Sequence, residues 1–122
     1  MSSALARLGQ SGERLASDYL TRRGHRVLAT NVRRREGEID LVTVDGETLV
    51  FVEVKLRRPS ALGGAVEALS AAKLRRLGAL AAAYAAEHPE LPAQLRVDLV
   101  AIDLEADGSL AGIRHVESVT EE

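Results

Sequence analysis

Cysteine is absent from the 122-residue chain, and aromatic side chains are limited to Tyr19, Phe51 and Tyr84. Without cysteine the chain cannot form a disulfide scaffold, a thiol nucleophile or a thiolate site for zinc or an iron–sulfur cluster. Three aromatic rings are also too few to stack on bases in the manner of an RNA-recognition motif or an OB-fold. The chemistry available to the chain therefore rests on carboxylates, amines, guanidinium groups and three histidines.

Long hydrophobic runs are also missing. The longest nearly apolar stretch, residues 77–86, is far shorter than the about 20 residues that a membrane-spanning helix needs. The amino-terminal stretch reaches charge at Arg7 and Glu13 before any apolar run of signal-peptide length. With 46% apolar and 28% charged residues, the composition is that of a globular protein. We therefore expect a cytoplasmic protein without membrane contact, folded as a single domain over residues 1–122.

The net charge of −2 conceals a separation of charge along the chain. Residues 1–60 carry an excess of three positive charges, whereas residues 61–122 carry an excess of five negative charges. Residues 22–35 contain six arginines and no acid. This pattern is typical of a local polyanion site, although a solvated basic surface would give the same pattern.

The spacing of apolar residues predicts two helices and five strands. Apolar residues recur at three- and four-residue steps over residues 4–23 and 65–87, which predicts amphipathic helices. β-Branched and apolar segments predict strands at residues 25–32, 38–44, 48–55, 95–102 and 110–116. The order of these elements favours an α/β protein with a mixed β-sheet flanked by helices.

The second and third predicted strands flank Asp45-Gly46, a pair typical of a two-residue hairpin turn. With that turn Glu38 lies opposite Glu53, and a register shifted by two residues instead brings Asp40 opposite Glu53. In both registers the alternation of side chains places four charged residues on one face, namely Glu38, Asp40, Glu53 and Lys55. The opposite face takes the apolar residues that can pack beneath a helix, namely Ile39, Leu41, Val50, Val52 and Val54.

Three carboxylates and one ammonium on one face would repel one another without compensation. They could be solvated, neutralised by Lys55 and nearby arginines, or joined by a divalent cation. Oxygen ligands suit Mg²⁺, which lowers the pKa of a bound water and neutralises charge on a phosphate. Glu53 and Lys55 lie in a strongly apolar strand, where unmatched charge is costly, and Lys55 is one of two lysines against 14 arginines.

The segments Gly37-Glu38-Ile39-Asp40-Leu41 and Phe51-Val52-Glu53-Val54-Lys55 together resemble the active-site signature of the PD-(D/E)xK nuclease superfamily. More narrowly, the chain resembles the YraN-like uncharacterised bacterial family, whose fold is similar to that of archaeal Holliday junction resolvases. Further matches to that family are Gly12-Glu13 with Ala16 and Tyr19-Leu20, Asn31-Val32-Arg33, Lys73, and Arg96-Val97-Asp98. The chain departs from the pattern in Ile39, which replaces a proline, in Val32, which replaces an aromatic residue, and in its polar end.

The resemblance implies a restriction-endonuclease-like core in the order αβββαββ. It also implies a metal-dependent endonuclease that hydrolyses phosphodiester bonds of DNA, including branched DNA, in repair or recombination. Asp40 and Glu53 would bind Mg²⁺ or Mn²⁺ with the Val54 backbone carbonyl as a third ligand, and Lys55 would be the catalytic lysine. Similarity to resolvases further implies a homodimer.

Two more acids receive roles from the resemblance. Glu13 would be a helix-borne acid directed at the metal, and Glu38 would be an outer ligand or a second acid. Because they flank the acidic strands in the sequence, two groups of arginines are candidates for phosphate contacts, with recognition through backbone and shape. These candidates are Arg33, Arg34, Arg35, Arg57 and Arg58, with Lys73 as a further one.

Two other classes of protein compete with a nuclease. A DNA-binding module with little turnover would bind DNA in a salt-sensitive way without metal-dependent cleavage, and a protein-interaction module would use the acidic second half as its contact surface. His25, His88 and His115 lack metal-ligand spacing, and we expect them at the surface or in turns. Arg75 and Arg76 of the second predicted helix are expected to lie on its solvated surface.

Overall fold

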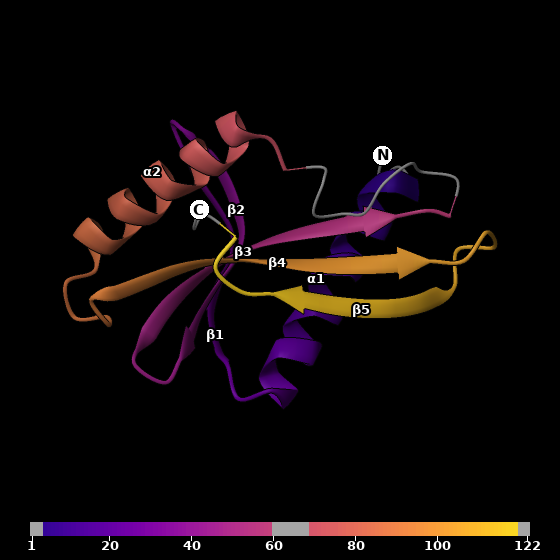
Figure 1. Cartoon of the computed structure of the whole chain (residues 1–122), viewed down its shortest axis with the longest axis horizontal. Helices are drawn as coiled ribbons and strands as arrows, with labels where there is room; N and C mark the ends of the chain where they lie inside the picture. The colour runs from indigo at the N-terminus through magenta and orange to yellow at the C-terminus, as the bar shows by residue number, and fades with distance from the viewer. Residues whose placement is uncertain (1–3, 60–68, 120–122) are drawn as a thin grey trace.

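The computed structural model describes residues 4–59 and 69–119, with side chains from residue 11 onward. In this part of the chain a helix, three strands, a second helix and two strands follow one another (Figure 1). Their bounds are α1 Ala4–Arg22, β1 Arg26–Arg34, β2 Gly37–Asp45, β3 Thr48–Arg57, α2 Ala71–Glu87, β4 Gln94–Leu104 and β5 Leu110–Val116. No helix in the described ranges is both long and apolar enough to cross a membrane.

The five strands form one mixed sheet in the order β1-β2-β3-β4-β5. Neighbouring strands are antiparallel except for β3 and β4, which are parallel. A parallel pair requires a crossover connection, and α2 lies in the segment that joins these two strands. The predicted α/β architecture, a mixed sheet with helices, is therefore confirmed.

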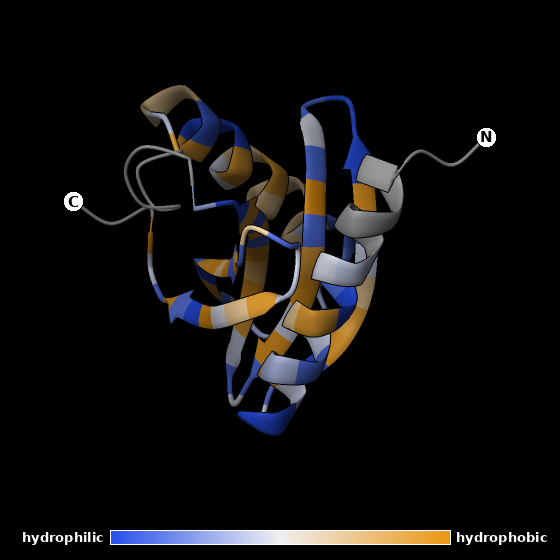
Figure 2. Cartoon of the chain, turned by 90° about the vertical axis from the view of Figure 1, so that its right-hand side faces the viewer, coloured by the Kyte–Doolittle hydropathy of each residue, from blue (hydrophilic) through white to orange (hydrophobic). Residues whose placement is uncertain are grey.

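Each helix packs on its own cluster of sheet residues. Ala16 and Leu20 of α1 cover the first cluster, whose buried strand residues are Leu41, Val50, Val52, Val100, Ile102 and Leu104. Leu77, Leu80, Ala81 and Tyr84 of α2 cover the second, whose buried strand residues are Val32, Ile39, Val42, Val44, Leu49, Phe51 and Val97. Figure 2 shows the corresponding bands of apolar and polar residues along α1 and the strands beneath it.

The hairpin between β2 and β3 turns one residue later than Asp45-Gly46. Asp45 pairs with Thr48, so Gly46 and Glu47 form the turn, and the positive φ of 61° at Gly46 suits a glycine there. Leu41 pairs with Val52. The first register predicted from the sequence is therefore wrong by two residues, whereas the alternative, in which Asp40 lies opposite Glu53, continues the observed pairing.

The second helix begins later than the sequence pattern predicts. Residues 65–68 of the predicted helix lie outside the described residues, and Leu69 and Ser70 precede the helix. Ser70 is the N-cap, and its side chain accepts a 3.1 Å hydrogen bond from the backbone N–H of Lys73. This cap satisfies one of the free N–H groups of the first turn and fixes the start of α2.

Candidate functional site

The candidate site lies where β2 separates from β3. Their backbone pairing stops at Leu41 and Val52, and Figure 1 shows the two strands parting beyond this point. The backbone N–H of Val54 instead donates a 2.8 Å hydrogen bond to Oδ2 of Asp40. The Asp40 side chain thus replaces a backbone partner and is held in the opening between the strands.

The separation also explains one difference from the predicted faces. Leu41, Val50, Val52 and Val54 pack in the α1 cluster as expected, but Ile39 lies in the α2 cluster. Because β2 no longer pairs with β3 at Ile39, that pairing does not hold the strand in the strict alternation used for the prediction.

Burial and neighbouring acids raise the pKa of Asp40. Burial is the largest cause that raises the pKa of Asp40 to about 7, and the negative charges of Glu53, Glu13 and Glu38 add to it. The hydrogen bond from Val54 opposes this shift. A carboxyl group with so high a pKa, next to a pocket and other acids, is typical of a functional site.

Glu53 is buried, with 4% of its surface exposed, and receives two ammonium groups. Lys73 Nζ lies 2.7 Å and Lys55 Nζ lies 3.4 Å from the same atom, Glu53 Oε2. Burial would lower the pKa of Lys73, but its contacts with Glu53 outweigh burial, so the pKa of Lys73 is raised. The pairing lets a carboxylate remain charged in a buried strand, where an unpaired charge is costly.

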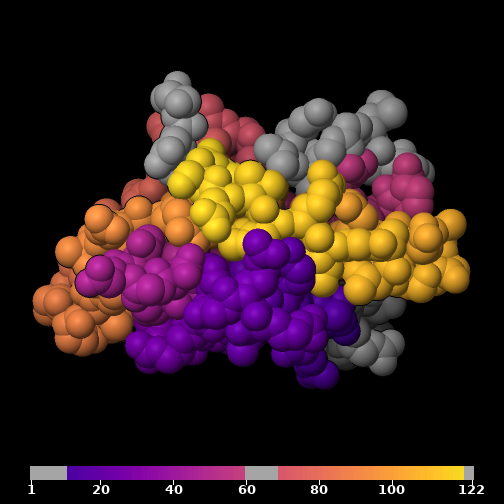
Figure 3. Space-filling model, turned by 60° about the horizontal axis from the view of Figure 1, so that its bottom comes forward, coloured from indigo at the N-terminus to yellow at the C-terminus, as the bar shows by residue number. Residues whose placement is uncertain are grey.

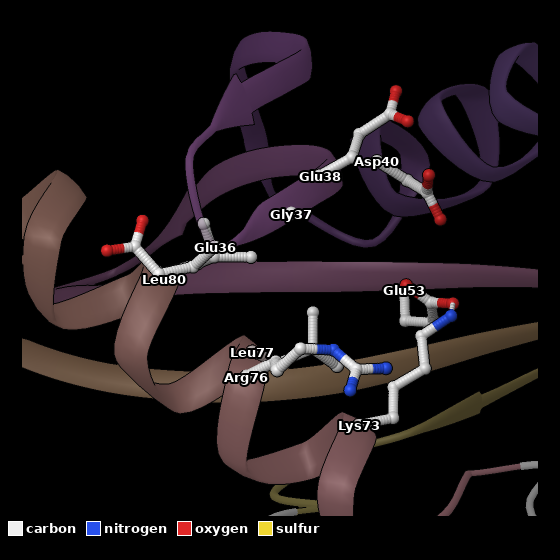
Figure 4. Close-up of a pocket in the computed structure, with 9 residues that line it drawn as sticks. All are labelled: Glu36, Gly37, Glu38, Asp40, Glu53, Lys73, Arg76, Leu77 and Leu80. Carbon is white, nitrogen blue, oxygen red and sulfur yellow. Dashed lines mark ion pairs between the residues drawn. The ribbon is translucent and has the colours of Figure 1, made fainter.

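Asp40, Glu53 and Lys73 line a pocket of about 250 Å³ between the strands and α2 (Figure 4). The charged residues of its wall are Glu36, Glu38, Asp40, Glu53, Lys73 and Arg76. In Figure 4 the carboxylates of Asp40 and Glu53 and the amine of Lys73 lie at one end, with Glu36 and Leu80 toward the other. Opposite charges thus gather at one end of an open pocket.

The two additional acids lie near Asp40 but differ in their contacts. Burial and Glu38 raise the pKa of Glu13, whereas a hydrogen bond with the Asn31 side chain lowers it, and the net direction is upward. Glu38 lines the pocket and forms a 3.7 Å ion pair with Arg33, and in Figure 4 its carboxylate points away from Glu53. The structure therefore brings both acids within electrostatic reach of Asp40, and their roles at a metal stay a prediction.

Close packing of α1 on β3 brings Glu13 to this region. A Cβ atom at Gly12 would lie 2.9 Å from Cδ1 of Leu56, so only glycine allows the present approach without movement of that side chain. Glu13 follows directly in the sequence. The small residue thus sets the distance between the helix-borne acid and the strand that carries Glu53.

The donor set fits a hydrated Mg²⁺ better than a fully protein-bound ion. In the described part of the chain no group of three or more histidine and acidic side chains is placed to hold a metal. Mg²⁺ commonly takes one or two carboxylates and keeps several waters, which Asp40 and Glu53 can satisfy. The Val54 backbone meets Asp40 through its N–H, and a ligand role for its carbonyl stays a prediction.

The first arginine group, Arg33 to Arg35, lies at the turn between β1 and β2, and this turn borders the pocket. Arg34 forms a two-armed ion pair with Glu87 of α2, at 2.6 and 3.1 Å. Arg33, with 80% of its side chain exposed, and Arg35 face solvent. Arg34 is thus engaged in holding the turn to α2, and of this group Arg33 and Arg35 stay the better placed candidates for phosphate contacts.

The second arginine group lines a different cavity. Arg57 and Arg58 border a space of about 370 Å³ together with Asp103 and Arg114. Arg76, expected only on solvated surface, is exposed but also lines the pocket of Asp40. Its place three residues after Lys73, on the same side of a helix, is the signal that could have found it.

The prediction that His25 and His115 lie at the surface or in turns is wrong. Both are buried, and their ring centroids are 5.5 Å apart. Figure 3 shows purple surface from the first part of the chain bordering yellow surface from its C-terminal part. His88 does occupy a turn, as the C-cap of α2.

The two histidines belong to a buried polar network centred on Asp98. Arg96 donates to both oxygens of the fully buried Asp98, at 2.9 and 3.0 Å, and His115 Nε2 lies 2.8 Å from Oδ2. Arg96 also donates to Asp45, which lies 3.5 Å from His25 Nε2. Burial is the largest cause that lowers the pKa of His25. The hydrogen bonds and ion pairs of this network join residues of β2, β4 and β5 and so tie these strands together.

The fold and site define an α/β protein with a five-stranded mixed sheet and a carboxylate–lysine pocket. The chain belongs to the uncharacterised protein family UPF0102, whose model matches residues 12–102. This segment contains Glu13, Asp40, Glu53, Lys55 and Lys73. The family membership indicated by the YraN-like resemblance is thereby confirmed.

Several bacterial relatives are similar over most of their length. A UPF0102 protein of Symbiobacterium thermophilum is 48% identical, over 85% of this chain and 88% of the relative. A UPF0102 protein of Renibacterium salmoninarum is 50% identical, over 78% of this chain and 80% of the relative. A UPF0102 protein of Mycolicibacterium vanbaalenii is 42% identical, over 94% of this chain and 89% of the relative.

Proposed function

We propose that the protein is a metal-dependent endonuclease that hydrolyses phosphodiester bonds of DNA, with a restriction-endonuclease-like core. The observation that carries this proposal is the meeting of Asp40, Glu53 and Lys73 in an open pocket, with Lys55 on the same carboxylate of Glu53. Acids that are buried together and lysines that can contact a phosphate are the parts that metal-assisted hydrolysis needs.

Each residue has a role in this chemistry. Asp40 and Glu53 would hold the cation, and the hydrogen bond from the Val54 N–H keeps the Asp40 carboxylate in the opening between the strands. When bound, Mg²⁺ or Mn²⁺ lowers the pKa of a coordinated water and offsets charge on the phosphate. Lys55 orients the attacking water or stabilises the negative charge that develops on the phosphoryl oxygens. Glu13 and Glu38 add negative charge around the cation.

The surroundings support DNA as the substrate. Arg33 and Arg35 hold phosphates beside the pocket, which fixes the position of the duplex without reading its sequence. With three aromatic rings in the chain, recognition depends on backbone and shape, which suits branched DNA. We place this activity in the cytoplasm, in repair or recombination, and infer a homodimer because the described part of one copy offers one such pocket for two DNA strands.

Cleavage assays test the proposal. Wild type, Asp40→Asn and Lys55→Met are compared on junction, duplex and single-stranded DNA with Mg²⁺ or Mn²⁺, and Asp18→Asn, an exposed acid of α1, serves as the control. Because both site residues act on the reacting phosphate, each variant loses about 100-fold or more in rate, whereas the control retains it. Equal cleavage by wild type and both site variants refutes the assignment.

A DNA-binding module without turnover is the second candidate. Two lysines already pair with Glu53, and among the described residues no group of three or more histidine or acidic side chains could hold a metal. This candidate predicts salt-sensitive DNA binding that is unaffected by divalent cations. Binding without any cleavage, in wild type and with either metal, favours it over the nuclease.

A further inference from the structure

Both lysines of the chain contact the same oxygen of the same buried carboxylate. The sequence contains 14 arginines and only these two lysines. The nearer, Lys73, comes from α2, and its Nζ lies 2.7 Å from Glu53 Oε2, against 3.4 Å for Lys55 on β3. A chain that otherwise uses arginine has lysine only where a compact ammonium on a flexible stem fits.

Both ammonium groups are engaged by Glu53 when no cation is present. Lys73 also lines the pocket together with Asp40 and Glu53 (Figure 4). A divalent cation held by Glu53 would meet the ammonium of Lys73 at the same carboxylate, and such close like charges repel strongly at low effective dielectric constant. Movement of this ammonium away from Glu53 relieves the repulsion, and a phosphodiester gives it a new anionic partner.

Lys73 is the ammonium that can move. Its backbone is anchored at the first turn of α2 by the Ser70 cap, and its side chain lines the pocket, whereas that of Lys55 is not among the residues of the pocket wall. Arg76 lines the same pocket one helical turn further on. An ammonium that leaves Glu53 therefore remains beside a second cationic group, in the space where a phosphate enters.

We propose that Lys73 is a positioning residue that occupies Glu53 in the absence of metal and transfers to the DNA phosphate when a divalent cation binds. The inference rests on the proposed function. It makes the binding of cation and of DNA mutually dependent, because the cation displaces Lys73 from Glu53 and the phosphate gives the displaced ammonium a new partner. Such coupling is reciprocal: DNA strengthens metal binding by the same factor by which metal strengthens DNA binding.

Titration of Mn²⁺ by calorimetry in the absence of DNA tests the first half of the proposal. Removal of the competing ammonium in Lys73→Met raises the affinity for Mn²⁺ by about tenfold or more. Lys73→Gln gives the same direction if the methionine variant is unstable. Arg75→Met is the matched control, because it removes an exposed charge from the same helix, and it binds Mn²⁺ as the wild type does.

The second half is tested by the same titration with a phosphorothioate duplex that resists cleavage. The duplex raises the Mn²⁺ affinity of the wild type by about tenfold, and this gain shrinks severalfold in Lys73→Met. A lysine with a merely structural role would lower, not raise, metal affinity when removed.

The outcomes separate this inference from the proposed function. If wild type binds Mn²⁺, Asp40→Asn does not, and neither Lys73→Met nor Lys73→Gln gains affinity, the role of Lys73 is refuted while the metal site stands. If neither wild type nor the Lys73 variants bind Mn²⁺, both proposals are refuted. Binding that is measurable only in the Lys73→Met or Lys73→Gln variants supports the inference most strongly.

Discussion

The backbone N–H of Val54 donates to the carboxylate of Asp40 over 2.8 Å, at the position where β2 has stopped pairing with β3. One side chain thereby completes the hydrogen bonding of a central strand and enters the pocket. The same contact links the fold to the site: β3 needs an acceptor at this position, and the acceptor supplied is an acid beside Glu53.

The raised pKa of Asp40 makes stability depend on pH. Because the folded-state pKa of about 7 exceeds the usual value of about 4, the folded protein binds more protons than the unfolded chain between these values. The contribution of Asp40 to the free energy of unfolding therefore falls as the pH rises from about 4 to about 7. Asparagine does not ionise, so Asp40→Asn does not lose stability in this pH range. At pH 8 its free energy of unfolding, measured with urea, should exceed that of wild type by on the order of 2–4 kcal/mol.

The comparison of wild type with Asp40→Asn contains its own control at low pH. Below pH 4 the Asp40 carboxyl is protonated in the folded and the unfolded chain, so the difference in unfolding free energy between wild type and Asp40→Asn becomes independent of pH. A difference that stays constant from pH 4 to pH 8 contradicts the raised pKa.

The buried network around Asp98 predicts a large loss of stability without loss of chemistry. Asp98→Ala leaves the Arg96 guanidinium and His115 without their buried partner, and such a break costs about 3–5 kcal/mol. Asp103→Asn is the matched control, because Asp103 lies on the same strand but pairs with the half-exposed Arg114. That variant loses at most about 1 kcal/mol.

Urea unfolding measures both variants, and Mn²⁺ titration measures the site. We expect Asp98→Ala, where folded, to bind Mn²⁺ as tightly as wild type, because the network lies on the α1 side of the sheet and lines no part of the pocket. Equal stability of the two variants would show that the network does not hold β2, β4 and β5 together.

Much of the secondary structure follows from local pattern, whereas the exact hairpin register does not. The alternation of apolar residues placed β2 and β3 and put Asp40, Glu53 and Lys55 on one side of the hairpin. Asp45-Gly46 and Gly46-Glu47 both contain the glycine that a two-residue turn requires, so sequence alone could not choose between two registers. The observed turn puts Gly46 first, with its positive φ.

The histidine network shows the other limit of sequence reasoning. His25, Asp45, Asp98 and His115 come from four separate segments, and only the curvature of the folded sheet brings the two histidines together. One local signal was available: Arg96 and Asp98 are two residues apart on one strand, so both lie on the same face and can pair. The burial of that pair depends on packing between distant elements, which no local spacing records.

The arginines of the β1–β2 turn predict a change in the salt dependence of DNA binding. Arg33→Ser with Arg35→Ser removes two exposed charges, so the slope of log affinity against log salt concentration becomes less steep by about 2. Arg23→Ser is the control, because Arg23 lies beyond the opposite end of β1. Fluorescence anisotropy over a range of salt concentrations measures the slope, and an unchanged slope in the double variant excludes phosphate contacts at this turn.

Freeing Arg34 from its ion pair with Glu87 is expected to strengthen DNA binding rather than weaken it. Glu87→Gln removes the carboxylate that holds Arg34 against α2 and leaves its guanidinium available to a phosphate. DNA affinity at low salt should rise by severalfold, with a steeper salt slope by about 1. Loss of affinity in Glu87→Gln would mean that Arg34 acts by holding the turn in place.

The most direct test of the account is a crystal structure grown with Mn²⁺ at a concentration that saturates binding, measured at the manganese absorption edge. We expect one anomalous peak between Asp40 and Glu53, about 2.0–2.3 Å from an oxygen of each, with Lys73 moved away from Glu53. A fully occupied peak elsewhere, or no peak while both lysines remain on Glu53, would contradict the claim that these two carboxylates form a metal site.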